Sequence, residues 1–379
     1  MIKKFHTDPK TRSPLAYPDH GGNPKAAAKI AGIDPESILD FSASINPLGP
    51  PTSVSQLLLE TPHLLNEYPD PESAALKKII AHEENIPENW IRVTNGSTEF
   101  IYLLPFLFSK DQEILIVNPF FSEYEKSFSR FGIKVHSHTL SHEQNFQIQI
   151  PKLFHQLEAI DNLGGVIIGH PNSPTGNLQT HALKDLTEYC ISREITLFVD
   201  ETFVDFLSTK VSIWNSYKEN PHLVIIRSLT KFYSLPGLRI GYGILSPEKN
   251  DVISPHQNPW SVNSLAQFIG SEVLSEKSFQ DETRIWLQKE KDFVLEELGR
   301  LKEIETFFSE TNFILFRIRD NNPALSHNLF NHLLFGGILL RNCGNFAGLD
   351  ESYFRISVRK RKDNQKLLNS LKEFFEKIS

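Results

Sequence analysis

The chain has 379 residues, of which 40% are hydrophobic and 22% are charged, and its formal net charge is −7. This composition is that of an ordinary folded enzyme, and the negative charge argues against a nucleic-acid partner. Two distant cysteines, Cys190 and Cys343, exclude a disulfide framework and a zinc motif. We therefore expect a cytoplasmic protein without a metal site, and no apolar run is long enough to cross a membrane.

The length allows two or three domains at about 150 residues each. The first 45 residues are polar and rich in proline and glycine, so we expect residues 1–45 to pack on a neighbouring domain rather than form their own core. We place a large domain at residues 46–270 and a smaller domain at residues 271–379. The small domain is the expected partner of the N-terminal segment.

In the large domain, short apolar runs alternate with longer amphipathic ones. The runs at 113–118, 165–170, 195–200 and 222–227 indicate buried strands, and residues 181–194 have the spacing of a helix. This alternation predicts an α/β fold with a mostly parallel sheet covered on both faces. Polar residues follow the predicted strands, at the edge where such sheets bind ligands: Asn118, His170, Asp200 and Ser228.

The last hundred residues follow another pattern. A long charged helix is predicted at 276–302, followed by the strand-like "TNFILFRI", a helix at 322–337 and the strand-like "GILLRN" and "YFRISV". A final helix is predicted at 364–378. The pattern indicates a small α+β domain.

Asp200 and Lys231 form the most informative pair in the sequence. Asp200 ends one predicted strand, and Lys231 follows the next strand in "SLTKFYSLPGLR". A lone aspartate at a strand end is usually a cap or an ion-pair partner, but a carboxylate and a lysine at one sheet edge fit pyridoxal phosphate. That cofactor needs an amine for its aldehyde and an acid partner for its ring nitrogen.

A phosphate anchor is predicted where "TNGSTEFIYLL" turns from a strand into a helix. Its Asn95-Gly96-Ser97-Thr98 segment can offer backbone N–H groups to a phosphate, although an ordinary helix cap has the same pattern. Ser228 and Arg239 can complete the anchor with a hydroxyl and a fixed charge. In "NPFFSEY", Phe120 or Phe121 can stack on a cofactor ring or belong to the core.

Four blocks in order resemble the fold-type I pyridoxal-phosphate enzymes of the class I/II aminotransferase superfamily: "PNSPTG", "DETF", "SLTKFYSLPGLRIGYG" and "YFRISVR". The resemblance implies that Lys231 holds the cofactor covalently and that Asp200 pairs with its ring nitrogen. It implies that Phe121 stacks on the ring and that Arg355 binds the substrate α-carboxylate. The phosphate would be held by Gly96, Ser97, Thr98, Ser228 and Arg239, and by Tyr68 of the partner subunit in a homodimer.

The chain departs from the superfamily pattern around the cofactor's phenolic oxygen. The usual asparagine before Pro-Thr-Gly is replaced by Ser173, with Asn172 one residue earlier, and either side chain can serve. Phe203 stands where a hydrogen-bonding tyrosine is usual, and Thr202 replaces an alanine beneath the ring.

The stretch "HGGNPKAAAKIAGIDPESILDFSASINPLGPP", with "PWSVN" and "LRNCGNFAGLD", resembles the L-threonine-O-3-phosphate decarboxylases of cobalamin biosynthesis. A phosphorylated amino acid would need two cationic sites, and Arg341 and Arg355 each follow or lie in a small-domain strand. By this resemblance the candidates for the substrate phosphate are His20, Asn46 and Arg341. L-serine-O-phosphate stays open as a substrate, since one methyl group is worth only about 1–3 kcal/mol in a pocket.

Two alternatives remain at this stage. Histidinol-phosphate aminotransferases share the fold and the "INPLG"-like and "EYPD"-like pieces, and would use nearly the same catalytic residues. A non-catalytic fold-type I protein is the second alternative, but Lys231, Asp200 and Arg239 are all retained.

Overall fold

The computed structural model describes residues 21–209 and 211–378. Its largest element is a seven-stranded sheet in the order β2-β8-β7-β6-β5-β3-β4. The strands β3 to β7 pair in parallel, and β8 is antiparallel to both of its neighbours. The bounds are β2 Ile91–Thr94, β3 Glu113–Asn118, β4 Lys134–Thr139, β5 Leu163–Gly169, β6 Thr196–Asp200, β7 Leu223–Ser228 and β8 Gly241–Ile244.

Alternating side chains bury both faces of this sheet. On β3, Ile114 and Ile116 belong to one apolar cluster, whereas Leu115 and Val117 belong to another. Such strands have no polar face, as expected for a parallel sheet between two helix layers. The helices of this part are α3 Ala74–Glu84, α4 Gly96–Leu103, α5 Glu123–Arg130, α6 Ile150–Glu158, α7 Thr180–Ser192, α8 Pro247–Ile253 and α9 Ser264–Val273.

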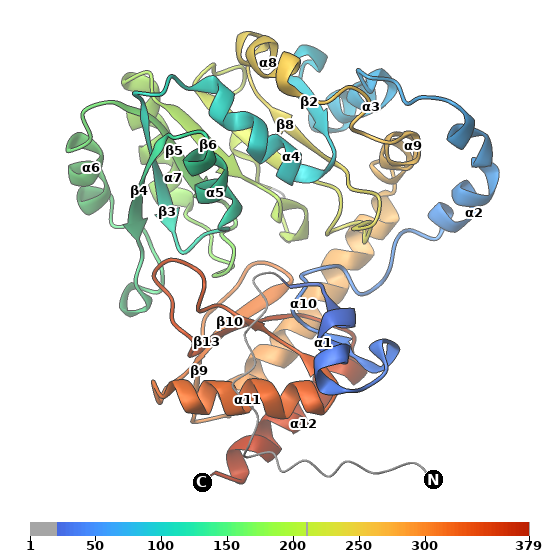
Figure 1. Cartoon of the computed structure of the whole chain (residues 1–379), viewed down its shortest axis with the longest axis vertical. Coiled ribbons are helices and arrows are strands. Elements are labelled where there is room, and N and C mark those ends of the chain that lie inside the picture. Colours follow the sequence, from blue (N-terminus) through green and yellow to red (C-terminus); the bar gives the residue numbers. More distant parts are fainter. Residues whose placement is uncertain (1–20, 210, 379) are drawn as a thin grey trace.

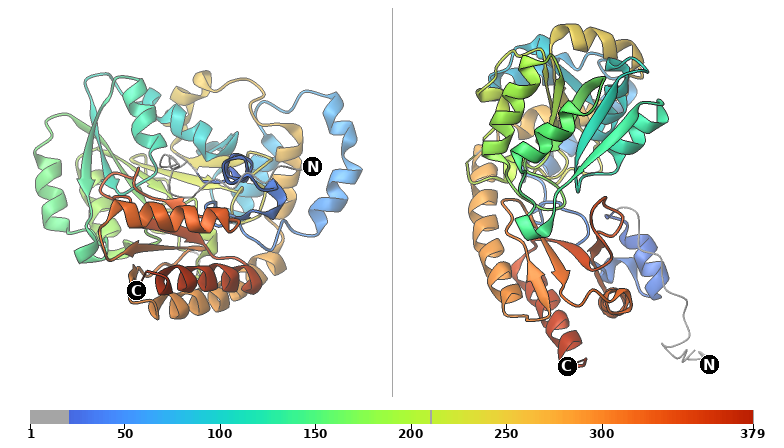
Figure 2. Two further views of the ribbon diagram at one scale, coloured as in Figure 1. Left: turned by 60° about the horizontal axis from the view of Figure 1, so that its bottom comes forward. Right: turned by 90° about the vertical axis from the view of Figure 1, so that its left-hand side faces the viewer.

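A smaller antiparallel sheet of four strands, in the order β12-β13-β10-β9, forms the second part of the molecule, with helices packed on it (Figure 1). Its long helix α10, Lys277–Gly299, runs along one side of the molecule past both sheets (Figure 2). The other elements are β9 Ile304–Thr306, β10 Phe313–Ile318, α11 Pro323–Phe335, β11 Ile338–Leu339, β12 Arg341–Asn342, β13 Tyr353–Ser357 and α12 Arg361–Glu376.

The chain's early residues lie on this smaller part. Strand β1, Leu39–Asp40, pairs in parallel with β11, and helix α1, Pro24–Ala31, contacts α11. Helix α2, Ser53–Glu60, then leads toward the large sheet. The domain boundaries at 45/46 and 270/271 stay predictions.

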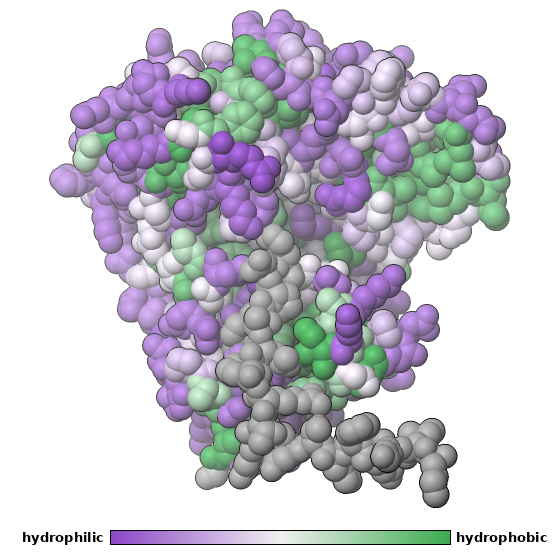
Figure 3. All heavy atoms as spheres, viewed as in Figure 1, coloured by the Kyte–Doolittle hydropathy of each residue, from purple (hydrophilic) through white to green (hydrophobic). Residues whose placement is uncertain are grey.

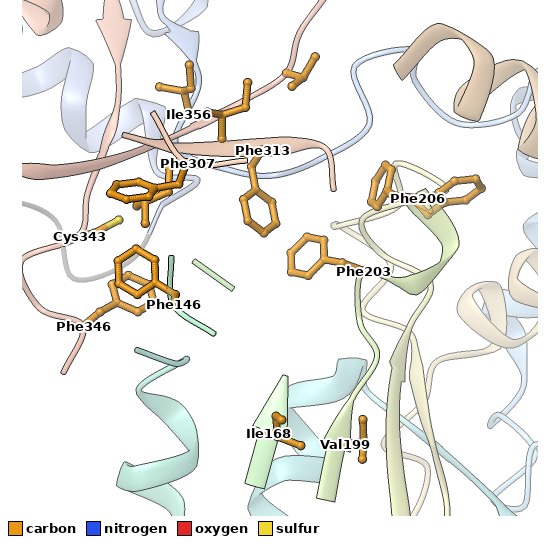
Figure 4. Packing of buried hydrophobic residues seen from close by; sticks show 14 of the residues in the cluster. Phe146, Ile168, Val199, Phe203, Phe206, Phe307, Phe313, Cys343, Phe346 and Ile356 are labelled. Carbon is orange, nitrogen blue, oxygen red and sulfur yellow. The ribbon is translucent and has the colours of Figure 1, made fainter. Parts of the chain in front are cut away.

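Aromatic side chains join the two parts. Phe203, just after β6, meets Phe313 of β10 edge to face with ring centroids 4.9 Å apart, and Phe146 packs on Phe307 at 5.1 Å (Figure 4). These rings are almost fully buried. The packed contact holds the small sheet at a fixed distance from the carboxyl edge of β6 and β7.

The predicted α/β fold of the fold-type I class is confirmed by this arrangement. The four strands predicted in the large domain are present, with ends shifted by one or two residues, and α7 and α10 occupy the predicted helical stretches. No helix in the described ranges is long and apolar enough to span a bilayer.

A buried ion pair supports the turn that follows β7. Arg227 is almost fully buried, and its Nη2 lies 2.8 Å from Glu201 Oε2, which also accepts from Ser212. Glu84 and Asp205 lie farther off, at 3.8 and 3.9 Å from the guanidinium. Removing one partner of such a pair leaves an uncompensated buried charge.

We expect Arg227→Met to lower the free energy of unfolding by about 3–5 kcal/mol, because Glu201 would stay buried without its cation. The exposed Arg300, paired with Glu296 and Glu297 on α10, gives the control Arg300→Met, with an expected loss below about 1 kcal/mol. Urea unfolding of both variants measures the difference. Equal losses of unfolding free energy in the two variants would show that the buried Arg227 pair stabilises the protein no more than the exposed Arg300 pair does.

Candidate active site

A cavity of about 780 Å³ lies between the carboxyl edge of the large sheet and the small sheet. This volume suits a cofactor together with a small substrate. Residues from at least five separate stretches line it, including the 21–24 turn and the segment that follows β1. The predicted site residues among its lining are Ser97, Thr98, Phe121, Ser173, Asp200, Lys231, Arg239, Arg341 and Arg355.

Lys231 stands in the turn after β7, with its Nζ 5.1 Å from the centre of the Phe203 ring. Desolvation lowers the pKa of Lys231 to about 8, and the charges of Arg355 and Arg239 act in the same direction, while Asp200 opposes them. A lysine with this pKa is partly neutral near physiological pH. It can therefore attack an aldehyde, as a covalent cofactor-binding lysine must.

Asp200 ends β6 and is paired with Ile226 of β7 in the sheet register. Its Oδ1 accepts a hydrogen bond from the backbone N–H of Thr202 at 2.8 Å, and its Oδ2 accepts one from the Tyr124 hydroxyl at 2.9 Å. The two donors fix the orientation of the carboxylate. The side chain thus lies on the wall of the cavity, where a protonated ring nitrogen would complement it.

The phosphate anchor forms at the first turn of α4. Gly96 has φ +74°, and a Cβ built there would lie 2.5 Å from Arg239 Nη2. Glycine is therefore required both by the backbone and by the close guanidinium. Ser97 and Thr98 follow in the lining, so that helix N–H groups and a fixed cation converge on one spot.

Ser228 does not line the cavity, but it contacts Thr230, which does. Its Oγ lies 2.8 Å from Thr230 Oγ1, and Thr230 is the one of the two that lines the cavity. Thr230 was not selected from the sequence, although it lies in the same block as Lys231.

The structure distinguishes the two candidates for the phenolic oxygen. Asn172 is buried, donates to Pro119 O and accepts from Thr175, and it does not line the cavity. Ser173 lines the cavity, and its Oγ accepts from Arg355 Nη1 at 2.8 Å. Because that oxygen accepts from Arg355, its own hydrogen remains available to a group in the cavity.

Arg341 and Arg355 lie directly opposite each other on β12 and β13. Like charges at facing positions of a strand pair repel. Desolvation lowers the pKa of Arg355 to about 10; Cys343 opposes this shift, and the Arg341 charge adds a smaller lowering effect. Arg341 donates to Asn342 O and to Asn345 Oδ1, and Arg355 to Ser173 Oγ and Ser42 O. Two cations held together at a cavity wall suit a ligand with more than one anionic group.

Two further predicted residues, Asn46 and Tyr68, do not line the cavity. Asn46 was predicted to contact a substrate phosphate, but its amide donates to Phe232 O and Thr283 Oγ1, and it is absent from the cavity wall. The buried amide instead ties the segment after β1 to α10, so that prediction is not supported. Tyr68 is 81% exposed and packs at a tilt against Trp260, and it does not line this cavity. His20 lies outside the described residues.

Tyr124 and Ser42 are functional candidates that sequence reasoning missed. Tyr124 stands in "NPFFSEY", where only the two phenylalanines were considered, and Ser42 stands in "DFSASINPLG". Phe121 precedes α5, so helix spacing could not have linked it to Tyr124.

The comparisons with known proteins agree with this geometry. Residues 36–371 match the family model described as aminotransferase class I and II. The chain belongs to this family. The cofactor of the family, and of this chain, is pyridoxal 5′-phosphate, and the residues at the cavity fit it: a desolvated lysine, a carboxylate, and a glycine turn under an arginine.

Individual members of the aminotransferase family differ in reaction. A threonine-phosphate decarboxylase of Salmonella typhimurium is 34% identical over 95% of this chain and 97% of its own. A histidinol-phosphate aminotransferase structure from Clostridium acetobutylicum has a TM-score of 0.82 at 32% identity, covering 89% of this chain and 98% of that one. An L-threonine-O-3-phosphate decarboxylase structure from Porphyromonas gingivalis has a TM-score of 0.77 at 28% identity, covering 89% and 99%.

In the cofactor-free protein we expect Lys231 to titrate near pH 8, because its ammonium is desolvated. Competitive acetylation across a pH series, read by mass spectrometry, measures the titration midpoint of each lysine. The exposed Lys126, ion-paired with Glu123 on α5, is the internal control for a lysine in contact with solvent. A midpoint for Lys231 equal to that of Lys126 would contradict the desolvated geometry.

Proposed function

We propose that this enzyme decarboxylates L-threonine-O-3-phosphate, releasing carbon dioxide and the amino-alcohol phosphate used in the cobalamin nucleotide loop. The observation that carries the proposal is the facing pair Arg341 and Arg355 on the cavity wall. A substrate with both a carboxylate and a phosphate would neutralise both guanidiniums at once. The near full-length likeness to a relative named threonine-phosphate decarboxylase supports the same substrate class.

The bound cofactor would supply an electron-accepting ring for the pair of electrons left when a bond to Cα breaks. Lys231 would hold it covalently, Asp200 would pair with its ring nitrogen, and Phe121 would stack on the ring. The phosphate would lie on the α4 turn, held by Gly96, Ser97, Thr98, Thr230 and Arg239, with Ser228 behind Thr230.

The substrate's position decides which bond at Cα breaks. In our assignment Arg355 holds the α-carboxylate and Arg341 holds the phosphate. Decarboxylation requires the Cα–carboxylate bond to stand perpendicular to the cofactor ring, whereas transamination requires the Cα–H bond there. Placement by the two arginines would therefore select the reaction, and Lys231 would return a proton to Cα.

Histidinol-phosphate transamination is the second candidate, favoured by the structural similarity to a histidinol-phosphate aminotransferase. That substrate carries a phosphate but no carboxylate at its amine-bearing carbon. Binding histidinol phosphate would leave the Arg355 guanidinium without an anionic partner, although its burial already disfavours the charge. The geometry therefore favours the phosphorylated amino acid.

The direct test incubates the holoenzyme with L-threonine-O-3-phosphate and follows carbon dioxide and aminopropanol phosphate. We expect the two products in equal amounts and no keto acid. Parallel reactions with L-serine-O-phosphate and histidinol phosphate decide between the three substrates. Stoichiometric keto acid without carbon dioxide would refute the decarboxylase proposal.

Arg341→Met probes the phosphate assignment in the same assay. Losing a charged hydrogen-bond partner should raise the KM for phosphothreonine about 10- to 100-fold. The matched control is Arg317→Met, since Arg317 lies on β10 of the same sheet and pairs with Glu305 away from the cavity. An unchanged KM in Arg341→Met would place the phosphate elsewhere.

We also propose that the enzyme is a homodimer in which Tyr68 reaches the partner's cofactor phosphate. Apolar side chains gather on the surface over α2 (Figure 3), where Leu58, Leu59 and Leu65 are 46%, 82% and 72% exposed. Tyr68 and Trp260, with centroids 4.9 Å apart, are exposed as well. A second copy of the chain would bury this surface.

A subunit-mixing experiment tests the dimer. Tyr68→Phe and Lys231→Ala each damage one half of a composite site, so either variant alone should be impaired. If the site is shared, co-expressed variants form mixed dimers with one intact site, and about a quarter of the wild-type activity should return. Activity no greater than the sum of the separate variants would show that each subunit works alone.

A further inference from the structure

The hydroxyl of Tyr124 bonds directly to the carboxylate that faces the cofactor site. Tyr124 is fully buried near the start of α5 and donates to Asp200 Oδ2 at 2.9 Å. Its ring also stacks on Phe120, with centroids 5.0 Å apart and an interplanar angle of 26°. Phe120 and Phe121 belong to the cavity wall. One side chain therefore touches two walls of the cofactor site.

The bond has a direct effect on Asp200 because few other groups hold that carboxylate. Its second oxygen accepts only the Thr202 N–H, and within residues 21–209 and 211–378 no side-chain cation forms a salt bridge with it. Lys231 is the cation that faces it, at longer range. Two neutral donors thus determine how the carboxylate is oriented.

Packing alone does not explain a tyrosine at this position. The neighbouring positions 120, 121, 128 and 131 are all phenylalanine, and the whole chain contains 28. A phenol hydroxyl at full burial costs free energy unless it is bonded, so phenylalanine would pack there without that cost. The hydroxyl is therefore explained by its bond to Asp200.

We propose that Tyr124 is a positioning residue that makes Asp200 the weaker base of its pair with the cofactor's ring nitrogen. A donated hydrogen bond stabilises the carboxylate anion, so the shared proton stays on the nitrogen, where it favours electron withdrawal from Cα. The inference rests on the proposed pairing of Asp200 with that nitrogen and is independent of whether CO₂ or an amino group leaves.

Tyr124 remains a donor throughout the working pH range. Burial, followed by the charge of Asp200 and the hydrogen bond to it, raises the pKa of Tyr124 well above its usual value. The phenol therefore stays protonated when the enzyme is active. It acts as a fixed donor and not as an acid or base in the reaction.

The test compares holoenzymes of wild type and Tyr124→Phe loaded with pyridoxal phosphate labelled with ¹⁵N in the ring. The ¹⁵N chemical shift at a fixed pH reports how much of the shared proton lies on the ring nitrogen. Because Asp200 without its donor would be the stronger base, we expect the Tyr124→Phe resonance to move toward the value of unprotonated pyridine, and kcat to fall about 10- to 100-fold with little change in KM. Tyr217→Phe, which removes a phenol–carboxylate contact to Glu188 on the surface, should match wild type.

The outcomes separate this inference from the proposed function. A wild-type nitrogen that is already unprotonated would overturn the Asp200 pairing and the role of Tyr124 with it. A protonated wild type with an unmoved ¹⁵N resonance in Tyr124→Phe would overturn the Tyr124 proposal alone, whatever happens to kcat. If Tyr124→Phe does not fold, 3-fluorotyrosine at position 124 is the second variant; as a stronger donor it should move the ¹⁵N resonance further toward the protonated value, and an unmoved resonance would overturn the proposal.

Discussion

The parallel register of β5, β6 and β7 is the constraint on which the site depends. Gly169, Asp200 and Ile226 are aligned across these strands, so the segments that follow them leave the sheet at one edge. Ser173, Asp200 and Lys231 reach a common cavity for this reason, although 58 positions separate the first from the last. A slip of one residue in β6 would turn Asp200 to the other face of the sheet.

Burial makes these groups reactive, and the packing between the two sheets produces the burial. The contact of Phe203 with Phe313 closes the space beside Lys231. The same contact keeps β12 and β13 near enough for their arginines to line the cavity. The charge of Arg355 then lowers the pKa of Lys231, so the small sheet contributes to the lysine's reactivity as well as to substrate binding.

The sequence was most informative where chemistry and local pattern coincide. The strands of the large sheet, Lys231, Asp200 and the Gly96 turn could be predicted, because each has a short pattern with a physical reason. The surroundings of Asn46 could not be predicted: a buried amide that bonds a backbone carbonyl and a threonine looks the same in sequence as one that binds a ligand. Tyr124 was missed because only the folded chain shows that α5 brings its hydroxyl to a strand 76 positions later.

The division of the site between two sheets explains why relatives with different reactions share this fold. The large sheet supplies the lysine, the carboxylate and the phosphate turn, which every cofactor-dependent reaction at Cα needs. The small sheet supplies Arg341 and Arg355, which in the proposed function would orient the substrate over that common machinery. When two relatives are compared, most of their backbone similarity comes from the shared large sheet. A high similarity therefore says little about which bond at Cα each relative breaks. That choice depends on a few side chains on β12 and β13, and on how firmly Ser173 and Ser42 hold Arg355 before a substrate arrives.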